Sequence, residues 1–126
     1  TEKQETAISD LAFQSKKTDA IISVNSTCRP RGPAPSGNLK SQTKLLLLGM
    51  TKILADRKEQ TLTVSDQPAL QTTAEGRING AQTKLRTVVL RKGTCTYDLL
   101  YISEPKQFGE YEALFALFVS SLKLKD

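Results

Sequence analysis

Few residues in this chain could do chemistry, and the cysteines come first among them. The sequence contains two cysteines, Cys28 and Cys95, and no histidine. Without histidine the commonest general base is missing, and a serine or cysteine nucleophile that depends on it is excluded. Two cysteines without histidine also cannot form a closed tetrahedral zinc site within one chain. We therefore expect a protein that is not an enzyme and that uses no cofactor and no metal.

The two cysteines stand at the ends of predicted strands. Cys28 ends the second predicted strand, and Cys95 begins the predicted central strand. If these strands are antiparallel neighbours, the two side chains meet at one edge of the sheet and can form a disulfide. Closing a loop of this length would stabilise the fold by about 4 kcal/mol on the chain-entropy account. The alternative is a pair of buried thiols in a reducing compartment, and we favour the disulfide.

Asp98 is the charged residue of the run from Cys95 to Ile102. A carboxylate buried in a strand needs a partner, and Arg86 or Arg91 on a neighbouring strand could supply one. No second acid stands beside Asp98 in the sequence. We therefore expect a structural ion pair rather than a catalytic carboxylate.

Positive charge is concentrated in one segment of the chain. The net charge is +5, and the stretch from Arg29 to Lys58 contains seven basic residues against the single acid Asp56. A basic surface attracts acidic proteins and anionic membranes over long range. We do not expect nucleic acid as a partner, because no helix-turn-helix spacing, zinc-finger ligand set or RNA-stacking motif accompanies the charge.

An outward-facing pair of leucines accompanies these charges. A helical arrangement of residues 39–54 places Leu45 and Leu48 opposite the main apolar stripe. We interpret them, with the nearby cations, as a contact face for a partner or an anionic membrane surface. The predicted contact face consists of Lys44, Leu45, Leu48, Lys52, Arg57 and Lys58. The alternative is that Gly49 breaks the helix, or that the N-terminal segment covers the leucines.

The 126 residues fit one domain, which we take as residues 1–126. Residues 1–10 are polar, and we expect a loose N-terminal segment there; the alternative is that Ala7 and Ile8 continue a strand. Residues 11–14 and 20–27 alternate as two strands of a hairpin do. Residues 29–38 contain three prolines and two glycines, which predict a loop.

A helix over residues 39–54 is expected next. It is followed by strand signals at residues 58–66, 69–78, 81–91 and 95–102. Asn79-Gly80 predicts a hairpin turn, because both residues tolerate the positive φ of a type I′ turn. Ser103 can cap a closing helix and Pro105 suits its first turn. The apolar residues of that helix fall on one face, and they are Phe108, Tyr111, Leu114, Phe115, Phe118, Val119 and Leu122.

These elements predict an α+β fold, with an antiparallel sheet of about six strands flanked by two main helices. Residues 69–102 should form a three-strand meander. Its last strand, residues 95–102, is rich in aromatic and aliphatic residues, which indicates a central position in the sheet.

Four segments resemble small bacterial exported proteins, many of which are lipoproteins of unknown function. These segments are DLAF at Asp10 to Phe13, SVNSTC ending at Cys28, the leucine-rich helix, and the Cys-x-Tyr-Asp strand before the phenylalanine-rich helix. The order of elements more distantly resembles the α/β/α sandwich of the PsbP-like fold. The resemblance implies a periplasmic or envelope-anchored protein, with Cys28 and Cys95 as structural residues and no catalytic residues. We expect any export signal or anchor to have been removed or never to have been present, because the chain begins at Thr1 without an apolar signal core.

Together these observations predict a non-enzymatic, exported or envelope-tethered domain that binds another envelope protein. The alternative is a small-ligand carrier or cryptic enzyme that uses a cleft between the sheet and its helices. Tight cover of the sheet by Phe108, Phe115 and Phe118 would count against this alternative, because their rings would fill such a cleft.

Overall fold

A computed structural model of the chain describes residues 6–14, 20–28, 39–48, 54–78 and 80–122. The elements in chain order are β1 (Thr6–Gln14), β2 (Ile21–Cys28), α1 (Leu39–Leu48), β3 (Leu54–Val64), β4 (Gln67–Ile78), β5 (Ala81–Lys92), β6 (Cys95–Ser103), the 3-10 helix η1 (Pro105–Glu110) and α2 (Glu112–Ser121). The strands form one sheet of six strands in the order β1-β2-β6-β5-β4-β3. Every neighbouring pair is antiparallel, which confirms the predicted α+β class.

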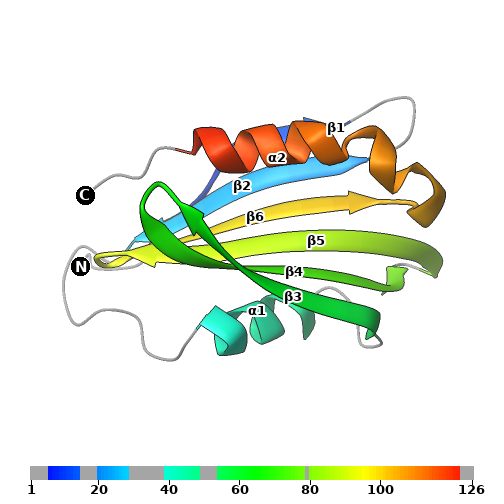
Figure 1. The fold of residues 1–126 in the computed structure, drawn as a ribbon, viewed down its shortest axis with the longest axis horizontal. Helices are drawn as coiled ribbons and strands as arrows, with labels where there is room; N and C mark the ends of the chain where they lie inside the picture. Colours follow the sequence, from blue (N-terminus) through cyan, green and yellow to red (C-terminus); the bar gives the residue numbers. More distant parts are fainter. Residues whose placement is uncertain (1–5, 15–19, 29–38, 49–53, 79, 123–126) are drawn as a thin grey trace.

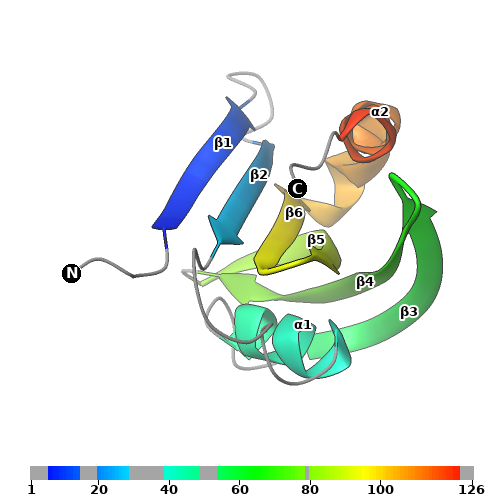
Figure 2. The same cartoon turned by 90° about the vertical axis from the view of Figure 1, so that its left-hand side faces the viewer.

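The two α-helices lie on opposite faces of this sheet (Figure 1). The sheet is strongly curved, with α2 inside the curve and α1 outside it (Figure 2). Each of the two predicted helices therefore packs on its own face of the sheet. We call the side that carries α2 the concave face and the side that carries α1 the convex face.

Strand β6 lies between β2 and β5, as its composition predicts. Every second residue of β6 is buried, from Cys95 to Ser103. Successive side chains of a strand point to opposite faces, so these buried residues share the concave face. The meander of β4, β5 and β6 is also confirmed, with Ile78 opposite Ala81 around the predicted Asn79-Gly80 turn.

The main core lies between α2 and the concave face. The Tyr101 ring stacks on Phe108 at a centroid distance of 4.4 Å and on Phe115 at 5.7 Å. The Tyr101 hydroxyl donates a hydrogen bond to the main-chain oxygen of Phe108. All three rings are at most 2% exposed, so they fill the space between the helix and the sheet.

A smaller core lies under α1 on the convex face. Leu47 packs there on Ala74 of β4 and Leu85 of β5. Three fully buried threonines complete this layer, and they are Thr43, Thr72 and Thr87. None of their hydroxyl oxygens has a hydrogen-bond partner in the described part of the chain. The buried layer between α1 and the sheet therefore contains polar as well as apolar side chains.

Two predicted boundaries are wrong because strand pairing extends further than the local sequence indicates. The segment expected to be loose, residues 1–10, already contains β1 from Thr6, which pairs with Cys28. The predicted helix over residues 39–54 is also too long, since α1 ends at Leu48. Leu54 instead begins β3 and pairs with Gly76. The predicted loop at residues 29–38 lies outside the described residues.

A hairpin between β3 and β4 is missed by the sequence analysis. Ser65 and Asp66 form its turn with φ of 49° and 65°, and Val64 pairs with Gln67 on either side of them. Pro68, which falls between the predicted strands at residues 58–66 and 69–78, lies near the start of β4. It pairs with Thr63, while the ladder to β5 begins only at the next residue, so the proline stands at a strand start where it is tolerated.

The closing helix is divided into two parts. Ser103 does not cap it, because this residue is the buried end of β6 and its hydroxyl donates to the Glu104 main-chain oxygen. Pro105 occupies the first position of η1, and α2 follows from Glu112. The predicted apolar face is confirmed, since Phe108, Phe115 and Val119 are buried in the main core.

Tyr101→Phe tests the hydrogen bond within the main core. The change keeps the ring and its stacking but leaves the buried Phe108 main-chain oxygen without its donor. We expect the free energy of unfolding to fall by about 1 to 3 kcal/mol, the usual cost of an unpaired buried polar group. Urea denaturation followed by circular dichroism measures this, and an unchanged midpoint would show that the bond contributes nothing.

Candidate functional site

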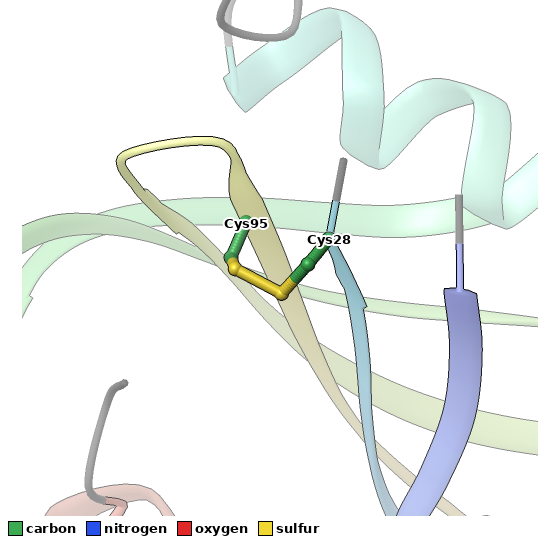
Figure 3. The surroundings of a disulfide bond; sticks show 2 residues. All are labelled: Cys28 and Cys95. Carbon is green, nitrogen blue, oxygen red and sulfur yellow. A yellow bond between two sulfur atoms is a disulfide. The ribbon is translucent and has the colours of Figure 1, made fainter. Parts of the chain in front are cut away.

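The predicted disulfide is confirmed. Cys28 and Cys95 are direct partners in the β2–β6 ladder, and their sulfur atoms are bonded (Figure 3). Their Cα atoms are 4.0 Å apart. The bond therefore joins two strands that are already neighbours in the sheet, at the end where β6 begins.

Two described members of the predicted contact face, Arg57 and Lys58, lie on opposite faces of β3. Arg57 makes an ion pair with Glu59 at 3.1 Å, and Lys40 of α1 reaches the same carboxylate at 3.4 Å. Lys58 pairs with Thr73 in the β3–β4 ladder, so it lies on the opposite face from Glu59, which pairs with Thr72. Successive side chains of β3 point to opposite faces of the sheet, so Arg57 and Lys58, which the sequence analysis grouped together, are separated.

The remaining members of the contact face are less informative. Lys44 is exposed on α1. The side chains of Leu45 and Leu48, and all of Lys52, lie outside the described residues. The proposed outward position of the leucines stays a prediction.

A hollow of ≈ 180 Å³ lies on the concave face. Three strands provide its lining, which consists of Lys58 of β3, Thr73, Ala74 and Glu75 of β4, and Lys84 of β5. The four polar residues share a face, because Lys58 pairs with Thr73 and Glu75 pairs with Lys84. The curvature of the sheet at β3 and β4 makes this face concave (Figure 2).

Arg86 borders the hollow and is already paired. Its Nη1 lies 2.9 Å from Oε2 of Glu112 at the start of α2. Its Nε donates a hydrogen bond of 2.9 Å to the Thr73 hydroxyl oxygen. The Thr73 hydroxyl accepts this bond, so its own hydrogen can be donated elsewhere.

Phe108 holds the cations of β5 in place. Lys84 Nζ lies 4.8 Å and Arg86 Cζ 5.1 Å from the centre of the Phe108 ring. Tyr101 stacks on the same ring. Since a cation over an aromatic face is attracted electrostatically, η1 positions both side chains at the edge of the hollow.

The hollow is missed in the sequence analysis, although part of the signal was present. Counting outward from the predicted Asn79-Gly80 turn places Glu75 opposite Lys84, as the structure has them. Lys58 could not be added in the same way, because its position depends on the unrecognised hairpin at Ser65 and Asp66.

Asp98 lies on the convex face, away from the hollow. It accepts a hydrogen bond of 3.2 Å from the Asn25 side chain of β2. Of the two predicted partners, Arg86 is wrong, because it lies on the concave face and binds Glu112. A pairing of Asp98 with Arg91 stays a prediction. Burial raises the pKa of the Asp98 carboxyl above its usual 3.8, and the Asn25 hydrogen bond partly offsets the increase.

The described residues contain neither a helix that could span a membrane nor a cluster of metal-binding side chains. No helix among them is long and apolar enough to span a membrane. No three histidine, cysteine, aspartate or glutamate residues in the described ranges lie close enough together to hold a metal ion.

Comparison with known proteins gives a structural neighbour but no sequence relative. The sequence matches no known protein family and no curated protein. The structure is similar to the crystal structure of PA94, a protein of unknown function from Pseudomonas aeruginosa, with a TM-score of 0.68. The match covers 100% of this chain and 86% of that protein, at 11% sequence identity. At this identity the similarity shows a shared fold alone.

Cys95→Ala tests the disulfide. Loss of the bond removes a cross-link over a sequence separation of 67 residues. We expect the free energy of unfolding to fall by about 4 kcal/mol, because the unfolded chain gains conformational freedom. Chemical denaturation in oxidising buffer measures the change, with reduced wild type as the matched control. Equal stability of the oxidised wild type and the variant would contradict the assignment.

Asp98→Asn tests the buried carboxyl. A raised folded-state pKa means that protonated Asp98 stabilises the fold fully below its unfolded pKa, and that this stabilisation is lost as pH rises through the folded pKa. Asparagine keeps an acceptor for Asn25 and cannot ionise. We therefore expect the variant to melt at a higher temperature than wild type at pH 7, with the difference disappearing near pH 3. A variant that melts lower at pH 7 would show that ionised Asp98 is favourably paired.

Proposed function

We propose that this chain is a non-enzymatic binding domain that recognises another protein through the charged hollow on its concave side. The observation that carries the proposal is that two lysines, Lys58 and Lys84, line the hollow. Within the described ranges, neither makes an ion pair with a carboxylate. A cation left unpaired beside a concave surface favours a partner that brings the opposite charge.

We further propose an extracytoplasmic location, with the domain in the periplasm or tethered to the cell envelope. The Cys28–Cys95 disulfide supports this, because such bonds persist in oxidising compartments and are rare in the cytosol. Helices on both faces of an antiparallel sheet support the PsbP-like α/β/α arrangement. Proteins of this architecture need not share a function, so the hollow and not the fold indicates the activity.

The space between α2 and the sheet gives little support to a carrier of apolar ligands. Phe108 and Phe115 are 2% and 1% exposed, and Phe118 packs against the same cluster. These rings occupy the volume that a ligand between the sheet and α2 would need. The hollow lies beside this cluster and has mostly polar residues, which suits a charged protein segment better than a lipid or another apolar ligand.

Site-specific photo-crosslinking tests which surface meets the partner. A photoreactive amino acid replaces Lys58 in the hollow or, as a matched control, Lys44 on α1; both lysines are exposed. After irradiation in the native organism, we expect a defined cross-linked protein from position 58 only. Cross-linking from position 44 alone would move the binding site to the convex side and overturn the proposal, and no adduct from either position would argue against a protein partner.

A further inference from the structure

The chemistry of the hollow also indicates what kind of protein segment it binds. Building on the proposed function, we propose that the hollow holds the carboxylate of an acidic side chain in an extended segment, together with a basic side chain two residues away. The carboxylate would lie over Thr73, between Lys58 and Lys84. The basic group would lie at Glu75.

Lys58 lies directly opposite Thr73, whereas Lys84 lies opposite Glu75 and therefore diagonally to Thr73 on the other side of β4. Lys58 belongs to β3 and Lys84 to β5, and β4 with Thr73 lies between these strands. Neighbouring strands are about 4.8 Å apart, so the two backbones flank Thr73 at a distance that lysine side chains span easily. An anion over β4 would therefore lie between the two lysine side chains, and the Lys84 ammonium, 4.8 Å from the centre of the Phe108 ring, would turn from that ring to reach it.

Arg86 prepares Thr73 as a hydrogen-bond donor and does not itself compete for the ligand. Its guanidinium is held by Glu112 at 2.9 Å, which neutralises its charge. Its Nε–H occupies a lone pair of the Thr73 oxygen, so the threonine hydrogen is directed away from Arg86. A carboxylate oxygen in the hollow can accept that hydrogen as well as the ammonium hydrogens.

Glu75 limits the negative charge that the hollow accepts. It lies two residues after Thr73 on the same face of β4, about 7 Å along the strand. It makes no ion pair within the described part of the chain, even though Lys84 is its direct partner in the ladder. Glu75 would repel a second acid or a phosphate and attract a cation at this distance. In an extended peptide, side chains two residues apart have the same spacing.

Peptide titration followed by amide chemical shifts tests the pattern on the whole protein. The probes are capped pentapeptides with the central sequences Glu-Ala-Lys, Gln-Ala-Lys and Glu-Ala-Gln. At millimolar concentration we expect Glu-Ala-Lys to shift the amides of Thr73 and Lys84 in a saturable way. We expect the loss of either peptide charge to weaken binding about two- to fivefold, the usual range for a partly exposed ion pair.

Protein variants separate this site from general charge attraction. Lys58→Gln and Lys84→Gln should each weaken binding of Glu-Ala-Lys, whereas Lys40→Gln, on the convex side, should not. Glu75→Gln should remove the preference for Glu-Ala-Lys over Glu-Ala-Gln. Because Lys58 is exposed, its variant should fold normally even if that of Lys84, which contacts Phe108, does not.

Several results would overturn the inference. These are equal binding of all peptides, binding that Lys40→Gln weakens as much as Lys58→Gln, or no shift at Thr73 with any probe. The proposed function fails separately, through the absence of a cross-link at position 58. A cross-linked partner whose peptides bind without an acidic residue would leave the function standing and remove only the charge pattern proposed here.

Discussion

The pairing of β6 with β2 on one side and β5 on the other is the constraint on which the rest of the structure depends. This register brings Cys95 to Cys28 and places the alternate residues of β6 under η1 and α2. Tyr101 then links the strand to the helical region through stacking on Phe108 and a hydrogen bond to its main chain. Phe108 in turn positions the cations of β5, so the edge of the hollow depends on contacts that begin in the central strand.

The pairing register of β3, β4 and β5 and the curvature of the sheet together form the hollow. No single segment of the sequence therefore predicts it. Its charged residues come from three adjacent strands, and each would be an ordinary surface residue in isolation. Arg86 occupies the same face but is neutralised by Glu112 of α2. The helix therefore decides which cations remain available for a ligand. The positions of positive charges along the sequence do not show which cations are paired. The contact face predicted from them therefore lay around α1.

Sequence reasoning was accurate where local signals and long-range packing agree. The Asn79-Gly80 turn, the apolar stripe of the closing helix and the meeting of Cys28 with Cys95 are of this kind. It failed where pairing with a distant strand overrides local preference. Leu54 continues a helical stripe in the sequence but pairs with Gly76 in the sheet. Ser65 and Asp66 adopt positive φ although neither is glycine or asparagine, so the turn that fixes Lys58 gave no strong signal.

The disulfide also divides the chain into a closed loop and two tails. The covalent ring between Cys28 and Cys95 contains α1, β3, β4 and β5, and with them every residue that lines the hollow. The first tail carries β1 and β2, and the second carries β6, η1 and α2. A mechanical pull on the two ends of the chain passes from β2 to β6 through the sulfur atoms and bypasses the ring. Tension can peel the tails away, but it cannot extend the backbone that builds the hollow while the bond is intact.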